Sequence, residues 1–152
     1  MNTALSRNIG GFIKSVASGA VDVVAAGAGD ASEDSGAWID RQGYLSGKLV
    51  ISYEAVLAAT ETLSIAANIQ DATDSSGTGA ADFGTAFANA VVATGQAGGS
   101  TERGTVEIDV DLNLANQYLR SQVTPDLSAS ATDTAIITAT FILGGAQELP
   151  PA

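Results

Sequence analysis

Alternation of apolar and polar residues is the clearest pattern in this chain, and it predicts β-strands. From Thr105 to Leu112, valine, isoleucine and leucine occupy the even positions, and Glu107, Asp109 and Asp111 occupy three of the odd ones. Neighbouring side chains of a strand point to opposite faces, so this segment predicts a half-buried strand with one wet face. Residues 63–71 alternate in the same way, with leucine, isoleucine and alanine on the expected inner face.

Weaker alternation predicts six further short strands. Proline cannot donate to a sheet ladder, so Pro125 is expected to end the strand that begins at Leu119. Residues 54–62 are interpreted as a helical turn or a loop. The expected segments are 21–26, a strand beginning at 37, 48–53, 83–94 as one strand or two, 119–123 and 135–143.

The spacing of these segments predicts the fold class. About eight short strands separated by loops rich in glycine, serine and aspartate indicate an all-β fold, an antiparallel β-sandwich or jelly roll. We assign residues 1–20 to an extended N-terminal arm, 21–146 to the sandwich and 147–152 to a C-terminal tail.

The proposed arm contains basic and apolar residues and no acidic ones. A flexible Gly10–Gly11 pair separates its apolar residues, and a frayed terminus or a first short strand is the alternative interpretation. If the segment is an arm, it docks on a neighbouring subunit, and the expected contacts are Arg7, Phe12, Ile13 and Lys14.

Composition excludes several kinds of chemistry. The chain has no histidine and no cysteine, which removes disulfides, thiolate chemistry, zinc and haem ligation and Ser-His-Asp catalysis. Seventeen acidic residues against six basic ones give a net charge of −11, which argues against nucleic acid and anionic membranes as partners. No cleaved signal is expected, because Asp22 and several glycines interrupt the early apolar run. We therefore expect neither an enzyme nor a cofactor.

Glu107, Asp109 and Asp111 form an acidic ladder on one face of their strand. Three carboxylates this close repel one another unless a cation offsets them. One interpretation is a solvated outer face balanced by Arg103 or Arg120. The other is a contact face for basic groups of a partner, or a cation site.

Two further groups of residues call for an interpretation. Residues 71–82 carry oxygen side chains at calcium-loop spacing, but the required sixth-position glycine is Ser76 and the last ligand is Asp82. We interpret them as a turn rich in aspartate, without a metal. Trp38 is expected in the core or in an interface, and with Tyr44 and Tyr53 it is the only cluster that could form a sugar-binding strip.

Three segments resemble parts of small virion proteins of tailed bacteriophages. Residues 63–74 resemble a strand ending in a Q-D-S-x-D-G turn, although the turn glycine is displaced to Gly77 and the loop is longer. Val110-Asp111-Leu112 with Tyr118-Leu119-Arg120 resembles an apolar-D-L…R-Y-apolar-R stretch, with Gln117 where a basic residue is common. Residues 139–145 resemble the closing strand that ends in L-G-G. The order and spacing agree over residues 45–146.

This resemblance implies a capsid decoration, or cement, protein. Such a protein lies on the outer surface of the virion, binds the major capsid protein and often forms homotrimers, and it needs no catalytic residue. The alternatives are another virion subunit, such as a tail-tube or minor capsid protein, or a carbohydrate-binding surface module.

Overall fold

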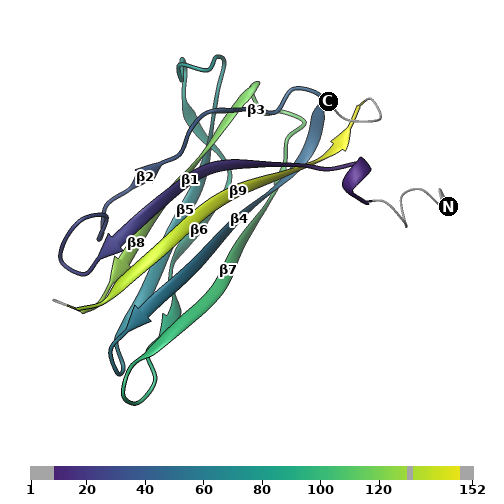
Figure 1. The fold of residues 1–152 in the computed structure, drawn as a ribbon. Helices are drawn as coiled ribbons and strands as arrows, with labels where there is room; N and C mark the ends of the chain where they lie inside the picture. Colours follow the sequence, from purple (N-terminus) through teal and green to yellow (C-terminus); the bar gives the residue numbers. More distant parts are fainter. Residues whose placement is uncertain (1–8, 130–131, 148–152) are drawn as a thin grey trace.

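The computed structural model describes residues 9–129 and 132–147 and consists of two antiparallel sheets packed face to face (Figure 1). A 3₁₀ turn, η1, covers Ile9–Gly11 just before the first strand. The strands are β1 Lys14–Val24, β2 Asp34–Ser35, β3 Ile39–Asp40, β4 Tyr44–Leu57, β5 Thr62–Ala72, β6 Ala81–Thr94, β7 Ser100–Asp111, β8 Tyr118–Leu127 and β9 Thr134–Ala146. No helix in the described ranges is long and apolar enough to cross a membrane.

The strand order is that of a jelly roll. The front sheet has the order β1-β9-β4-β7, and the back sheet has the order β2-β8-β5-β6. The short strands β2 and β3 both pair with β8, so together they act as one interrupted strand. Each sheet then has four strands, and the expected all-β antiparallel sandwich is confirmed.

The connections define two ends of the sandwich. The upper end in Figure 1 carries the turns at 41–43, 73–80 and 112–117, and both the start of β1 and the end of β9 lie there. The lower end carries the connections at 25–33, 58–61 and 95–99.

The core consists of the inward-facing residues of both sheets. Leu63, Ile65 and Ile69 of the back sheet are buried opposite Leu49, Ile51 and Phe141 of the front sheet. Burying one such side chain stabilises the fold by about 1.5–3 kcal/mol. The alternation predicted for 63–71 and 105–112 is confirmed, since Val106, Ile108 and Val110 are also buried.

The first strand starts earlier than the sequence pattern indicates. Residues 14–20 lie in β1 and pair with β9, so the sandwich begins at residue 14 rather than at residue 21. Val16 and Val21 both pack against the core although their odd spacing does not fit a regular strand. A bulge between Ala17 and Gly19 inserts the extra residue and restores the alternation.

Pro125 does not end its strand, which continues to Leu127. The N and C=O of a strand residue point to the same side, and the Pro125 C=O accepts a hydrogen bond from the Ala31 N–H on the side away from β5. The nitrogen of Pro125, which has no hydrogen to donate, therefore faces no ladder partner. A strand tolerates proline at such a position.

Two other segments are more extended than expected. Residues 54–57 continue β4 instead of forming a helical turn, and β7 starts at Ser100 rather than at Thr105. In 54–57, Ala55 and Leu57 are buried while the apolar Val56 lies on the wet face, which hides the alternation. Residues 81–94 form one strand, which is irregular against β5.

A buried polar junction closes one side of the sandwich. Ser18, at the bulge of β1, accepts a hydrogen bond from the Ser121 N–H of β8 at 3.1 Å, and the two hydroxyls lie 2.9 Å apart. Gly36 lies against both serines, and its N–H donates to the Ser121 C=O at 2.8 Å. The N–H of Ala37 donates to the Ser18 C=O at 2.7 Å. This junction ties the front sheet to the back sheet.

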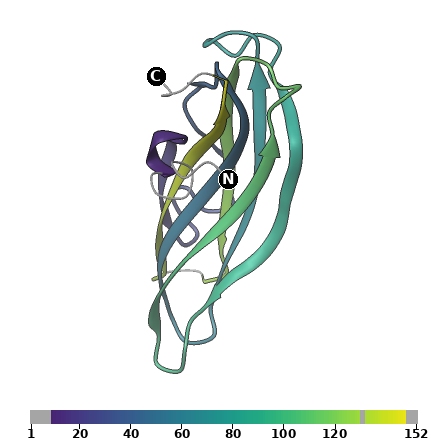
Figure 2. The same ribbon diagram turned by 90° about the vertical axis from the view of Figure 1, so that its right-hand side faces the viewer.

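The opposite side is formed by β6 and β7 (Figure 2). They are the outer strands of different sheets, joined at the lower end by the 95–99 turn. The Tyr53 hydroxyl crosses from β4 to donate to the Val92 C=O of β6 at 2.7 Å, passing over Gly104 of β7. Tyr53 is thus a link between the two sheets on this side.

Candidate functional site

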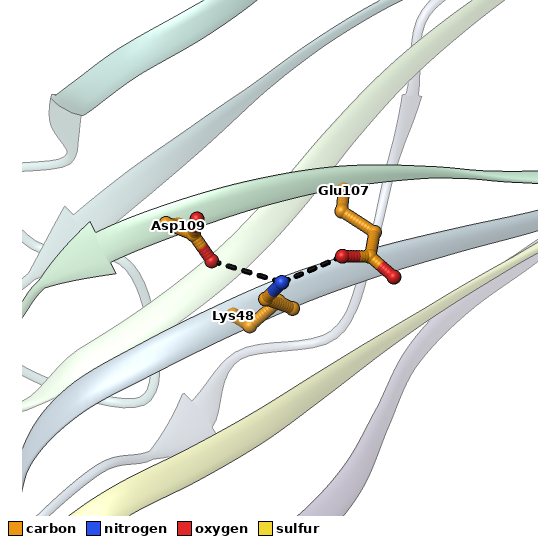
Figure 3. A network of polar contacts seen from close by, with 3 residues as sticks. All are labelled: Lys48, Glu107 and Asp109. Carbon is orange, nitrogen blue, oxygen red and sulfur yellow. Dashed lines mark hydrogen bonds and ion pairs between the residues drawn. The ribbon is translucent and has the colours of Figure 1, made fainter.

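The acidic ladder lies on the outer face of the front sheet, and two of its carboxylates, those of Glu107 and Asp109, flank Lys48 of the neighbouring strand (Figure 3). The Lys48 ammonium donates to Glu107 Oε2 at 2.6 Å and lies 3.1 Å from Asp109 Oδ1. The hydrogen bonds to Glu107 and then to Asp109 raise the pKa of Lys48 above its ordinary value. A protein ammonium therefore occupies the place between two carboxylates that a bound cation would need.

The prediction that Arg103 or Arg120 would balance the charge of the ladder was wrong. Arg103 pairs with Glu54 at 2.8 Å. Arg120 donates to the Gln70 side chain at 2.7 Å, and its guanidinium lies 4.6 Å from the ring centre of Trp38. Lys48 faces the ladder because the β4–β7 register sets it opposite Asp109.

Replacing Lys48 by methionine is expected to make stability depend on salt and to remove an alkaline contribution. The folded pKa of Lys48 is raised, so its stabilisation is complete below 10.5, the ordinary value, and is lost as the pH rises through the folded value. In urea titrations, the difference between the wild type and Lys48→Met should be constant from about pH 7 to pH 9 and shrink above about pH 10.5. Added salt should stabilise Lys48→Met relative to the wild type, because it screens the carboxylates.

Arg103→Met is the matched control, since it removes one exposed cation of the same sheet that has a single carboxylate partner. It should show a smaller salt effect than Lys48→Met. Equal responses of the two variants would contradict a special role of Lys48 in the ladder.

One hollow lies beside the ladder on this outer face and has a volume of about 530 Å³. The predicted arm and the predicted acidic ladder meet at this hollow, because Ile13 lies there beside Asp109 and Asp111. We call it the face hollow; its walls also include Ser46, Lys48 and Ile142.

The other predicted arm residues lie near or outside this region. Phe12 is half-buried just before β1, and Lys14 is the exposed first residue of β1. Arg7 lies outside the described residues. The arm contacts therefore stay predictions, and Ile13 alone is brought to the ladder.

The turn that follows the ladder is firmly held. Asp111 Oδ1 accepts the Asn113 N–H at 2.9 Å, and the buried carboxylate of Asp71 accepts the Asn116 N–H at 2.7 Å. Arg41 donates from Nε to the Asn116 C=O at 2.9 Å and from Nη2 to the Ala115 C=O. This fixed turn presents Leu114, whose side chain is 88% exposed.

A second hollow, of about 380 Å³, lies between the upper parts of β6 and β7. Aromatic and aliphatic side chains line it, together with the last two acids of the ladder. We call it the seam hollow; its walls include Phe83, Thr85, Asp109, Val110, Asp111 and Leu114. The end of β7 is thus an acidic ridge between two hollows.

The turn interpretation of residues 71–82 is confirmed for 73–80 only, because Asp71 lies in β5 and Asp82 lies in β6. Asp74 accepts hydrogen bonds from the Ser76 and Thr78 N–H groups, and its contacts, first with Thr78, hold its pKa below the ordinary value. Asp71 is bonded to Asn116, and Asp82 accepts from Asn68 and Gln70. Among residues 9–129 and 132–147, no group of three or more acidic side chains is placed to hold a metal ion.

Trp38, Tyr44 and Tyr53 do not form a sugar-binding strip. Tyr44 is buried, and Tyr53 spans the β6–β7 side. Trp38 lies at the surface between Arg120 and Gly77 of the 71–82 loop, rather than in the core.

Sequence reasoning missed Lys48 and Leu114. The role of Lys48 depends on a register between segments almost sixty positions apart, which leaves no local signal. Leu114 did have one: it is a lone large apolar residue in the polar turn Asn113-Leu114-Ala115-Asn116.

The comparisons with known proteins identify no family and no function for this chain. No family model matches the chain, and no curated protein was found similar to it. Among solved structures, the chain is similar to T=1 particles derived from infectious bursal virus, with 12% identity, a TM-score of 0.44 and coverage of 91% of this chain and 32% of that one. It is also similar to the Gx strain of infectious bursal disease virus, with 9% identity, a TM-score of 0.39 and coverage of 86% and 35%. The chain spans about a third of each of these proteins, and likenesses this remote carry no inference about function.

Proposed function

We propose that the protein is a tailed-phage capsid decoration protein, which binds the outer surface of the capsid lattice and stabilises the head. The jelly roll supports the proposal only as an analogy, because viral capsid domains share this architecture with lectins and cupins. The stronger support comes from where the phage-like segments lie.

The observation that carries the proposal is that all three phage-like segments meet at the upper end. The first runs along β5 into the 73–80 turn, the second flanks the 112–117 turn, and the third is the final part of β9. The two hollows, the ladder and Leu114 lie at the same end. We infer that this end faces the capsid.

The N-terminal segment is part of the proposed contact. Ile13 lies in the face hollow, and the η1 turn just before it lies at the same end of the sandwich (Figure 1). We propose that Arg7, Phe12, Ile13 and Lys14 reach the major capsid protein, and that the protein associates with itself as a trimer on the lattice.

Binding to empty capsid shells of the virus whose genome encodes this chain tests the proposal. The purified protein should sediment with the shells, saturate a fixed number of sites and raise the temperature at which the shells rupture. A reconstruction of the decorated shell should place the sandwich outside, around threefold positions, with its upper end inward. Density in the tail or the absence of binding would overturn the proposal.

Deletion of residues 2–8 tests the arm in the same assay. Occupancy should fall at least tenfold, whereas deletion of residues 148–152 should leave it within about twofold. Equal occupancy of the two deletion variants would remove the arm from the proposal.

A further inference from the structure

The seam hollow is a surface hollow whose walls combine apolar side chains with two carboxylates. Of its apolar residues, Val110 is buried, Phe83 is half-buried and Leu114 is exposed. β6 and β7 belong to different sheets, and no backbone pairing joins them in the described residues. The upper seam therefore presents apolar side chains beside two carboxylates, between two strand edges that do not pair with each other.

Leu114 has the properties of an anchor for a partner. Its side chain is almost fully exposed, yet its turn is held in place, because Arg41 donates to the Asn116 C=O and Asp71 accepts from the Asn116 N–H. An exposed apolar residue on an ordered turn loses little conformational entropy on docking, so its burial against a partner is opposed by a smaller ordering cost.

The negative charge beside the seam hollow favours a partner with a basic side chain. Lys48 pairs with Glu107 and Asp109, but Asp111 has no ion-pair partner among the described residues. The acids of the ladder outnumber their lysine, so the ridge keeps a negative charge. A partner with a basic side chain at this place is attracted electrostatically by the ridge, and a partner with an acidic side chain is repelled.

A second copy of this chain fits this chemistry poorly. It carries the same surplus of seventeen acidic over six basic residues. Four of its basic side chains, those of Arg41, Lys48, Arg103 and Arg120, already bond within their own molecule. The other two, Arg7 and Lys14, belong to the N-terminal segment that is proposed to reach the major capsid protein.

We propose that the seam hollow binds an extended segment of a different protein. An apolar side chain of that segment packs against Leu114 and Phe83, and a neighbouring lysine or arginine pairs with Asp111. The inference rests on the proposed function in one respect, since the segment is taken to belong to the subunit of the capsid shell.

Shell-binding titrations with four variants test the inference. Leu114→Ser should weaken binding about tenfold or more. Asp111→Asn keeps the acceptor for Asn113 and should weaken binding several-fold at low salt, with a reduced salt dependence. The matched controls lie on the lower part of the front sheet: Ile136→Ser, at a side chain 55% exposed, and Asp22→Asn. Both controls should bind within about twofold of the wild type.

The outcomes separate the two proposals. Absence of binding by the wild type overturns the proposed function. Binding by the wild type together with unchanged binding by Leu114→Ser overturns the seam inference alone. A photo-reactive amino acid at position 114 identifies the occupant: cross-links to a shell segment with a lysine or arginine beside an apolar residue support the inference. Cross-links to a second copy, or to a segment without a basic residue, overturn it.

Discussion

Replacing Gly36 by alanine is expected to lower the free energy of unfolding by about 3 kcal/mol. A Cβ at this position would lie 2.5 Å from the Ser18 hydroxyl, 2.7 Å from the Ser121 hydroxyl and 2.7 Å from the Ser18 carbonyl oxygen. The carbonyl is backbone and accepts the Ala37 N–H, so it cannot move without breaking the junction between the sheets. Urea unfolding followed by circular dichroism measures the loss.

Gly43→Ala is the matched control for this prediction. Gly43 has a positive φ of 87°, but a Cβ there would meet nothing within 4 Å. Only backbone strain opposes alanine at this position, and the expected loss is about 1–2 kcal/mol. A loss at Gly36 no larger than that at Gly43 would contradict the crowded junction.

Replacing Gly104 by alanine is expected to cost about 2 kcal/mol, less than at Gly36. The new Cβ would lie 2.4 Å from the Tyr53 hydroxyl and 2.7 Å from its Cζ. These atoms are the end of a side chain, so Tyr53 can swing away, at the loss of its packing and of its hydrogen bond to Val92. Burial, and then Glu102, raise the pKa of Tyr53, so in Gly104→Ala this tyrosine should titrate closer to the ordinary 10.0.

A double-mutant cycle with Tyr53→Leu checks the mechanism. Without the aromatic ring the clash disappears, and Gly104→Ala should then change stability by less than about 0.5 kcal/mol. Additive losses would show that Gly104 is needed for a reason other than Tyr53.

Strands with a regular alternation of apolar and polar residues could be predicted from the sequence. Features that depend on bulges or on which strands pair could not. Residues 105–112 alternate as expected because their inner face is purely aliphatic and their outer face purely polar. Residues 14–24 do not, because the bulge at Ser18 shifts the period within one strand. Val56 hides the continuation of β4 for a different reason, since it is an apolar residue on the wet face.

The same distinction explains the candidate site. Its acids could be named from the sequence, because three carboxylates on one strand face form a local pattern. Their lysine partner could not, since it depends on which strands become neighbours. Ile13 was named as a contact of an arm, but only the packing of β1 against β9 brings it to Asp109.

The position of β9 has a consequence for how the chain folds. β9 lies between β1 and β4, so Lys14 pairs with Leu143 across almost the whole sequence. Until β9 has been synthesised, β1 has no sheet partner and β4 has one unpaired edge, and such edges are prone to associate with other chains. Folding dominated by pairings this distant takes milliseconds to seconds. The front sheet cannot be completed before β9 is synthesised, and a chain cut short before Thr134 would leave β1 and β4 without their common partner.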